Sequence, residues 1–197
     1  MSHQSVLNWI HKYIYLIRNA VKKLNPKLSF NYYSDETMIK CSGKYHNFGV
    51  VMDAENRFVI ATNYVETEHI NSDDTARLWQ TAKEIQRPKR LRTDSHKTYP
   101  DAFNKVFYTR YQKDQVIWTR VKPLRDGKYN FLMERLFNSL KERIKIMRGF
   151  KQSWSAKILL DGYFIWYNFI RPHMTFEKTP AERVGIVKND WMGLIGI

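Results

Sequence analysis

The sequence predicts an α/β fold in which a mixed sheet carries helices on its faces. From Phe30 onward, apolar and polar residues alternate through three successive segments, and short turns between the segments predict an antiparallel arrangement. After residue 70, segments of helical period alternate with short apolar runs, which indicates strands connected through helices. A hydrophobic fraction of 43% in 197 residues is sufficient for a sizeable core.

A helix is expected at the start of the chain, over residues 2–24. Ser2 is a suitable N-cap, Val6 and Ile10 begin a helically spaced apolar series, and Asn25-Pro26 ends the segment. A basic, Trp-bearing helix after short polar residues is typical of the recognition helix of a helix-turn-helix. A plain amphipathic helix would have the same pattern, so the sequence leaves both interpretations open.

The remaining elements follow from the period of the apolar residues and from the turn-forming residues between segments. In chain order, we expect strands at 30–42, 45–53 and 57–65, a helix at 73–86, a strand at 89–94, one or two helical turns at 98–107, a strand at 115–121, long helices at 130–150 and 153–170, and a short helix from Thr179-Pro180. Three antiparallel strands followed by alternating helices and strands define the predicted mixed sheet.

The helix expected at 130–150 carries an acidic residue within its most apolar part. Glu134 lies at the edge of an apolar stripe, and basic residues follow along the same flank. A surface glutamate that balances nearby lysines would contribute well under ~1 kcal/mol and would need no further role. The stripe consists of Met133, Leu136, Phe137, Leu140, Ile144 and Met147, and the basic flank of Lys141, Lys145 and Arg148.

Two further acids stand where this architecture can bring them to Glu134. Asp35 lies near the start of the first expected strand, and Asp94 ends the fourth. If these strands are neighbours, both aspartates can meet Glu134 at one edge of the sheet, where three close carboxylates would raise each other's pKa. Two divalent cations, Mg²⁺ or Mn²⁺, would relieve the repulsion and could activate a water or a 3′-hydroxyl for attack on a phosphodiester.

Each aspartate also has a simpler interpretation. Asp35 could be an exposed strand-edge residue, and the adjacent Glu36 carries the same charge. Asp94 could be a turn-forming residue. Asp53 competes with Asp35 for a place in the site, but its position between two apolar runs is typical of a hairpin turn.

The composition narrows the class of partner and the compartment. A formal charge of +14 favours a polyanionic partner, and the sequence has no polybasic tail and no apolar run long enough to span a bilayer. The N-terminus lacks the apolar core of a signal peptide. The single cysteine, Cys41, excludes an internal disulfide and a multi-cysteine zinc site, and the six histidines lack metal-ligand spacing. We therefore expect a cytoplasmic protein with a nucleic-acid partner.

Several motifs follow one another along the chain in a specific order. They are Asp35-Glu36-Thr37-x-Ile39-Lys40 with Gly43-Lys44-Tyr45-His46, then Arg92-Thr93-Asp94 with Tyr99, then Asn130-x-x-x-Glu134-Arg135 continuing through Lys141-x-Arg143 to Met147-Arg148-Gly149-Phe150, and finally Tyr167-Asn168-Phe169-Ile170-Arg171-Pro172-His173 with Thr179-Pro180-Ala181-Glu182. Together these segments, within residues 30–186, resemble the catalytic-domain motifs of prokaryotic insertion-sequence transposases of the DDE class.

This resemblance implies an RNase H-like fold, as in retroviral integrases, with a mixed five-stranded sheet of three antiparallel strands and two parallel strands flanked by helices. It implies a catalytic domain at 29–186, preceded at 1–24 by a helical remnant of an N-terminal helix-turn-helix DNA-binding region and followed by a C-terminal tail at 187–197. Members of the family usually carry a complete DNA-binding region, whereas only its last helix resembles the start of this sequence.

The resemblance also implies the reaction and its participants. The chain would be a transposase that uses two metal ions, with Asp35 bridging both and with Asp94 and Glu134 each binding one, to cleave the transposon end and join the freed 3′-hydroxyl to target DNA. Its partner would be double-stranded DNA, bound by a homo-oligomer in association with the nucleoid of a prokaryotic cell. Residues expected to contact DNA are Asn130, Lys141, Lys145, Arg148 and Arg171.

Two other functions remain open at this point. The first is a nuclease of the same fold that cuts nucleic acid without joining strands. The second is a catalytically inactive, DNA-binding remnant of a transposase.

Overall fold

The structure, a computed structural model, describes residues 2–121, 130–187 and 190–195. The chain forms two compact units, one of Leu28–Gly149 and one that combines Met1–Lys27 with Phe150–Ile197. The domain boundaries expected from the sequence, at 1–24, 29–186 and 187–197, stay predictions. Residues 188–189 and 196–197 of the expected C-terminal tail lie outside the described residues.

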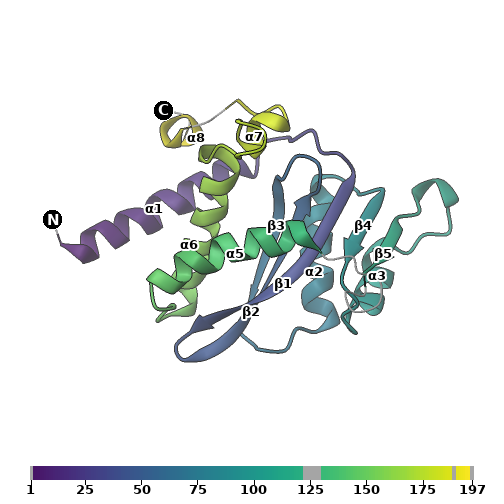
Figure 1. Ribbon diagram of the computed structural model, residues 1–197, viewed down its shortest axis with the longest axis horizontal. Helices are drawn as coiled ribbons and strands as arrows, with labels where there is room; N and C mark the ends of the chain where they lie inside the picture. The colour runs from purple at the N-terminus through teal and green to yellow at the C-terminus, as the bar shows by residue number, and fades with distance from the viewer. Residues whose placement is uncertain (1, 122–129, 188–189, 196–197) are drawn as a thin grey trace. The chain divides into compact units, whose positions relative to one another are not determined.

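The unit Leu28–Gly149 contains a five-stranded sheet with the strand order β3-β2-β1-β4-β5 (Figure 1). Its strands are β1 (Asn31–Cys41), β2 (Lys44–Asp53), β3 (Val59–Val65), β4 (Arg90–Thr93) and β5 (Ile117–Arg120). The first three strands pair antiparallel, while β4 runs parallel to β1 and β5 runs parallel to β4. The mixed sheet predicted from the sequence is confirmed, and the first and fourth strands are neighbours.

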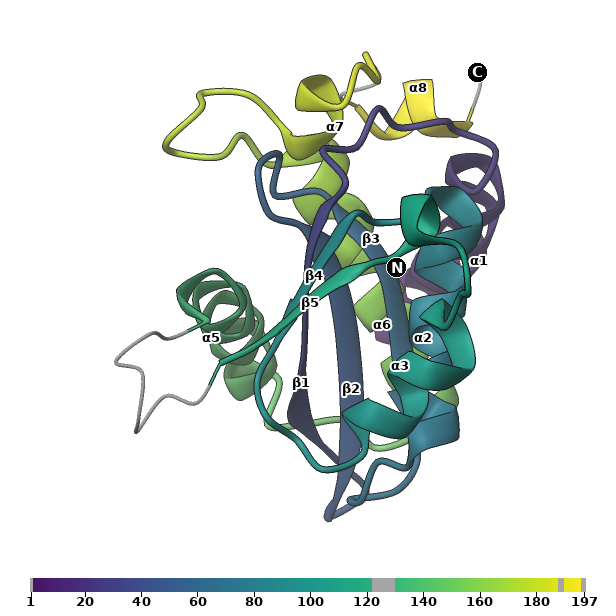
Figure 2. The same ribbon diagram turned by 90° about the vertical axis from the view of Figure 1, so that its right-hand side faces the viewer.

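Helices cover both faces of this sheet. Figure 2 shows α2 (Ser72–Ile85) and α3 (Tyr99–Phe107) on one side of the strands and α5 (Phe131–Ile146) on the other. The side of α2 that faces the sheet carries Trp79, which is 1% exposed and donates a hydrogen bond from Nε1 to Ser34 Oγ at 2.8 Å. A short 3₁₀ turn, η1 (Gln112–Asp114), precedes β5.

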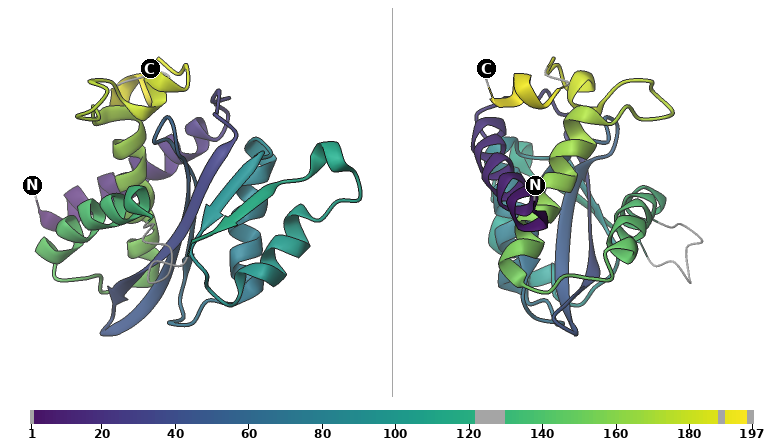
Figure 3. Two further views of the ribbon diagram at one scale, coloured as in Figure 1. Left: turned by 45° about the vertical axis from the view of Figure 1, so that its right-hand side comes forward. Right: turned by 90° about the vertical axis from the view of Figure 1, so that its left-hand side faces the viewer.

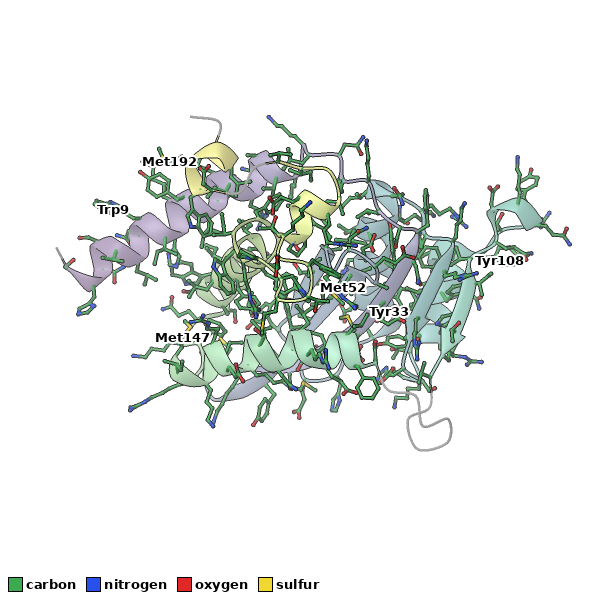
Figure 4. The ribbon with its side chains drawn as sticks, turned by 45° about the horizontal axis from the view of Figure 1, so that its top comes forward. Trp9, Tyr33, Met52, Tyr108, Met147 and Met192 are labelled. Atoms are coloured by element: carbon green, nitrogen blue, oxygen red, sulfur yellow. The ribbon has the colours of Figure 1, made fainter. Side chains whose placement is uncertain are left out.

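The apolar stripe of α5 is one turn shorter than the sequence predicted. Met133, Leu136, Phe137 and Leu140 are buried, as expected, whereas Met147 is 48% exposed (labelled in Figure 4). The reason is that the helix ends at Ile146 and the backbone then turns away through Gly149, whose φ is 85°.

The second unit is helical. It contains α1 (His3–Val21), α6 (Ser153–Ile165) with its π-helical continuation η2 (Trp166–Ile170), α7 (Pro180–Arg183) and α8 (Trp191–Ile195). In both views of Figure 3, α1 crosses α6. The predicted helices at the start of the chain, at 153–170 and after Thr179 are present, and α8 is an element that the sequence did not predict.

A small residue and an ion pair hold α1 to α6. A Cβ atom at Gly162 would lie only 2.3 Å from Ile14 Cδ1, so the helices approach at a distance that a larger residue would prevent. Next to this contact, Arg18 Nη1 lies 2.9 Å from Asp161 Oδ2. Burial raises the pKa of the Asp161 carboxyl, and the bond from Arg18 opposes that effect. Among the described residues, no helix has both the length and the apolar character needed to cross a bilayer.

Two glycines of the sheet unit provide a test of the backbone geometry at the end of α5. Gly149 and Gly43 both have a positive φ, 85° and 78°. Replacing either with alanine should lower the free energy of unfolding by about 1 kcal/mol through backbone strain. At Gly149 the new Cβ would also lie 3.1 Å from the Lys40 carbonyl oxygen, whereas at Gly43 nothing lies within 4 Å. We expect Gly149→Ala to destabilise the protein more than Gly43→Ala in urea unfolding. Equal losses would contradict the close approach of Gly149 to β1.

Candidate active site

The alternation of side chains along β1 decides which acids face which helices. Ser34 accepts a hydrogen bond from Trp79 of α2, and Tyr32 donates one to the carbonyl of Gln86 at 2.9 Å, so these even-numbered side chains point toward α2 and α3. Successive side chains of a strand point to opposite faces. Asp35 therefore lies on the other face, the one that carries α5.

The pairing of β1 with β4 places the second aspartate beside the first. The strands are parallel and in a register that pairs Tyr33 with Arg92. Asp35 and Asp94 each follow these paired residues by two positions, so both lie further along the same face. The neighbouring strands that the sequence-based hypothesis required are thus present.

The third acid comes from the first turn of α5. Asn130 is the N-cap of this helix, and its carbonyl accepts the backbone N–H of Glu134 at 3.0 Å. Met133 and Phe137 are buried, while Glu134 is exposed at the edge of the buried stripe. This placement lets α5 pack on the sheet and still carry a carboxylate beside the ends of β1 and β4.

Asp94 and Glu134 act electrostatically on Asp35. The pKa of Asp35 is raised from 3.8 to about 7, first by burial and then by the negative charges of Glu36, Asp94 and Glu134. A hydrogen bond from the Glu36 N–H to Asp35 Oδ1, at 2.9 Å, acts in the opposite direction. The structure thus brings Asp35, Asp94 and Glu134 into one cluster of negative charge, and no cation among the described residues contributes to the pKa shift of Asp35.

The cluster has the chemistry of a site for a hard divalent cation. Within residues 2–121, 130–187 and 190–195, no three His, Cys, Asp or Glu side chains are already spaced as a metal-binding group. However, all the donors in the cluster are carboxylate oxygens, the ligands that Mg²⁺ and Mn²⁺ prefer. The negative charges of Glu36, Asp94 and Glu134 around Asp35 are of the sign that a bound cation would neutralise.

Backbone hydrogen bonds fix the orientation of both aspartates. Asp94 Oδ1 accepts the backbone N–H of His96 at 2.9 Å, and Asp35 Oδ1 accepts that of Glu36. Each bond uses one oxygen of its carboxylate. The two side chains are therefore held in place by their own local backbone.

Glu36 and Tyr99 form a second pair that the sequence did not assign. The Tyr99 hydroxyl donates a hydrogen bond to Glu36 Oε2, and His96 Nδ1 lies 4.0 Å from Glu36 Oε1. Burial raises the pKa of Glu36 to about 7, the bond from Tyr99 opposes this, and the charge of Asp94 adds to it. Burial also raises the pKa of Tyr99 well above its ordinary value. The period of two along β1 distinguishes Glu36 from Asp35, because consecutive residues face opposite sides.

Asp53, the competing acid, has a structural role. Its side chain is fully buried and accepts hydrogen bonds from the backbone N–H groups of Ser29, Glu55 and Asn56, at 2.6, 2.9 and 3.0 Å. These bonds close the turn between β2 and β3 and connect it to the chain before β1. The interpretation of Asp53 as a turn residue is confirmed.

The residues expected to contact DNA lie in different environments. Lys141 and Lys145 are exposed on α5, and Arg148 is exposed just after it. Asn130 is only 6% exposed, and its side-chain amide has no hydrogen-bond partner among the described residues. Arg171 belongs to the other unit, where its guanidinium lies 5.5 Å from the centroid of the Trp166 ring. Contact of these five residues with DNA stays a prediction.

Comparison with known protein families identifies one match over most of the chain. A family model described as a DDE domain matches residues 29–173. This range includes all of the sheet and the positions of Asp35, Asp94 and Glu134. No curated protein sequence matches the chain.

Solved structures with a similar fold include three from retroviruses. A cryo-EM structure of a simian T-cell lymphotropic virus intasome has a TM-score of 0.59 and 15% identity, covering 81% of this chain and 55% of that chain. The catalytic core domain of BIV integrase has a TM-score of 0.56 and 16% identity, with coverages of 79% and 93%. The catalytic core domain of HTLV-2 integrase in complex with magnesium has a TM-score of 0.53 and 14% identity, with coverages of 81% and 95%.

These similarities bear on the fold. The chain spans only about half of the retroviral chain in the intasome. It spans nearly the whole length of each of the two integrase catalytic cores. Because the identities are low, the likeness shows the fold alone. The RNase H-like fold expected from the sequence motifs is confirmed.

The raised pKa of Asp35 predicts how stability depends on pH without divalent cations. Between pH 4 and 7, the Asp35 carboxyl keeps its proton in the folded protein, where its pKa is about 7, and has lost it in the unfolded chain, where its pKa is 3.8. The free energy of unfolding should therefore decrease as pH rises from 4 to 7, and Asp35→Asn should remove up to about 1.4 kcal/mol per pH unit of this decrease. The measurement is urea unfolding in EDTA across this range.

The control for this prediction is Asp101→Asn, which removes an exposed carboxylate of α3. It should leave the slope of stability against pH unchanged. A slope in Asp35→Asn equal to that of the parent would show that Asp35 titrates normally, and that the negative cluster does not act on it.

Proposed function

Because this chain belongs to the DDE-domain family of insertion-sequence transposases, which are polynucleotidyl transferases, we propose that Asp35, Asp94 and Glu134 are the carboxylates with which it cleaves and transfers DNA strands. The observation that carries this proposal is the negative cluster around Asp35. Besides its desolvation, acids from β1, from the end of β4 and from α5 all raise the pKa of one half-buried carboxyl, to about 7. Structural acids are normally paired with cations or hydrogen-bond donors, so a cluster of acids that lacks a cation among the described residues favours a functional site.

The donor set supports the assignment of Mg²⁺ or Mn²⁺ as the cofactor. Asp35, Asp94 and Glu134 would hold two such ions, which when bound activate the attacking water or 3′-hydroxyl and stabilise the leaving oxygen of the phosphodiester. The protein contributes the orientation of the ligands. Asp35 and Asp94 are aligned by the backbone N–H groups of Glu36 and His96, and Glu134 is carried on the first turn of a rigid helix.

The pair of Glu36 and Tyr99 supports the same site from the opposite face of the sheet. Tyr99 lies in the first turn of α3, which follows the loop that carries Asp94 and His96. Its hydrogen bond to Glu36 connects this helix to β1 one residue after Asp35. Glu36 therefore helps to fix the distance between the two aspartates, and we assign it a positioning role.

The partner we propose is double-stranded DNA, both as transposon end and as target, bound by an oligomer of this chain. The formal charge of +14 supports a polyanionic partner. Lys141, Lys145 and Arg148 extend this charge along α5 from the turn that carries Glu134. Because phosphate contacts hold DNA without reading its sequence, these residues would place the backbone near the acids and leave sequence recognition to other parts of the protein.

Substitution of one acid tests the proposed function. Asp94→Asn removes a charge and keeps the shape of the side chain, so cleavage of transposon-end duplexes in Mg²⁺ or Mn²⁺ should decrease by more than about 100-fold. Affinity for DNA should change little. The cation should also stabilise the parent, by about 2.7 kcal/mol at 100 times its Kd, and stabilise the variant less. Gel assays of cleavage and joining and thermal unfolding with added cation provide the measurements.

Asp101→Asn is the matched control, because it changes an exposed aspartate outside the cluster and should cleave like the parent. Cleavage by Asp94→Asn at the parental rate would contradict the assignment of the three acids. Cleavage without joining by the parent would instead identify a nuclease. Binding of DNA without cation binding would identify an inactive remnant.

The basic flank of α5 leads to a prediction about affinity. Replacing Lys141 and Lys145 with alanine should weaken binding equally on transposon-end and random duplexes, because phosphate contacts carry no sequence information. It should also reduce the dependence of log affinity on log salt by roughly one unit for each phosphate that the protein no longer neutralises. Fluorescence anisotropy between about 50 and 200 mM salt measures both quantities.

The control for the flank is the joint replacement of Arg110 and Lys113, two exposed cations near η1, with alanine. It removes the same charge and should leave the slope nearly unchanged. A strong preference of the parent for the transposon-end duplex at moderate salt would contradict mainly electrostatic binding, and would assign base recognition to the N-terminal helix.

A further inference from the structure

Arg92 is a cation on the same face of the sheet as the two catalytic aspartates. It precedes Asp94 by two residues, and its partner across the strands, Tyr33, precedes Asp35 by two. Residues two apart on a strand share a face. Arg92 and Tyr33 (labelled in Figure 4) thus form a cross-strand pair directly next to the pair of aspartates.

The two side chains of this pair contact each other in two ways. Arg92 Nη1 donates a hydrogen bond to the Tyr33 hydroxyl at 3.2 Å, and the guanidinium carbon lies 5.3 Å from the centroid of the Tyr33 ring. Both residues are half-buried. Arg92 Nε is buried and has no hydrogen-bond partner among the described residues. The aromatic ring and the hydroxyl therefore hold the guanidinium in place without neutralising its charge.

Other arginines of the protein engage acceptors in structural roles. Arg18 pairs with Asp161, and Arg87 donates to the carbonyl of Phe107 at 3.1 Å. Arg92 is not within ion-pair distance of any carboxylate in the part of the chain that the structure describes. Half-burying a guanidinium without an anion is costly, so a site of this kind is suited to an anion that arrives from outside.

We propose that Arg92 and Tyr33 together bind a backbone phosphate of the DNA strand that is cleaved, next to the scissile phosphate. This inference rests on the proposed function. The guanidinium offers its remaining N–H groups, and the Tyr33 hydroxyl, which accepts from Arg92, can donate its own hydrogen to the same phosphate. Both act as positioning residues, because they hold the strand while the three acids act on the scissile bond.

The distance between Arg92 and Asp94 along β4 limits which phosphate of the DNA strand Arg92 can bind. Two residues of a strand span about 6.6 Å, and successive nucleotides of one DNA strand are separated by about 3.4 Å along the helix axis. If the DNA strand runs along β4, a phosphate on Arg92 lies one or two nucleotides from a phosphate beside Asp94. Binding there fixes the position of the strand along the face that carries the acids.

A purely structural pair would behave differently from a phosphate site. If Arg92 and Tyr33 only joined β4 to β1, their removal would lower the free energy of unfolding and leave the salt dependence of DNA binding unchanged. A phosphate contact contributes about 0.9 to the slope of log affinity against log salt for B-DNA. The slope therefore separates the two roles.

The test is fluorescence anisotropy of the full chain with a labelled random-sequence duplex in Mg²⁺, over about 50 to 200 mM salt. Arg92→Gln should weaken binding and reduce the slope by about 0.9. Tyr33→Phe should weaken binding about ten- to 100-fold without changing the slope, since it removes a hydrogen bond to a charged phosphate but removes no charge. The double variant should lose less affinity than the sum of the two single losses, because both groups act on one phosphate. Lys113→Gln, an equal loss of charge at an exposed site, should leave the slope unchanged.

Arg92→Lys keeps the charge and provides the second variant if Arg92→Gln does not fold in urea unfolding controls. It should retain the parental slope of log affinity against log salt. In this background, adding Tyr33→Phe should no longer weaken DNA binding, because a lysine lacks the planar guanidinium that can donate to the Tyr33 hydroxyl and to the phosphate at the same time. Parental affinity and slope in Arg92→Gln, or an equal loss of slope in Lys113→Gln, would overturn the inference. Failure of the parent to bind DNA would overturn the proposed function itself, so the two failures are distinguishable.

Discussion

Repulsion between the half-buried carboxyl of Asp35 and the acids around it is the interaction on which the rest of the site depends. Burial and the charges of Glu36, Asp94 and Glu134 raise its pKa to about 7. Near neutral pH, a divalent cation would therefore compete with a proton for the Asp35 carboxylate. The strand that carries Asp35, β1, is paired on both sides, with β2 and β4. A divalent cation would neutralise the same charges and so stabilise this face of the sheet.

The period of two along β1 and β4 distributes the functional groups between the two faces of the sheet. One face carries Asp35, with Arg92 and Tyr33 beside it, and the other carries Glu36 under the Tyr99 hydroxyl. Two adjacent acids of similar chemistry thus take different roles. Asp35 is available to a cation and a DNA strand, whereas Glu36 is occupied by a hydrogen bond that holds α3 to the sheet.

Much of this architecture was predictable from local patterns in the sequence. Alternation predicted the strands, helical spacing predicted the buried face of α5, and turn chemistry separated Asp53 from the candidate acids. The pairing of β1 with β4 could only be assumed, because strand neighbours are set by contacts distant in the sequence. Arg92 and Tyr33 were missed for the same reason, since their relation exists only across two strands. The burial of Asn130 and the exposure of Met147 depend on where α5 begins and ends, which periodicity locates only within a few residues.

The most direct test of the account is anomalous diffraction from crystals soaked in Mn²⁺ above pH 7, where Asp35 is ionised. We predict Mn²⁺ peaks about 2.1 Å from carboxylate oxygens of Asp35, Asp94 and Glu134, with Glu134 drawn toward the two aspartates. Peaks elsewhere, or none at Asp35 under conditions in which the protein cleaves DNA, would contradict the central claim that this cluster is the catalytic metal site.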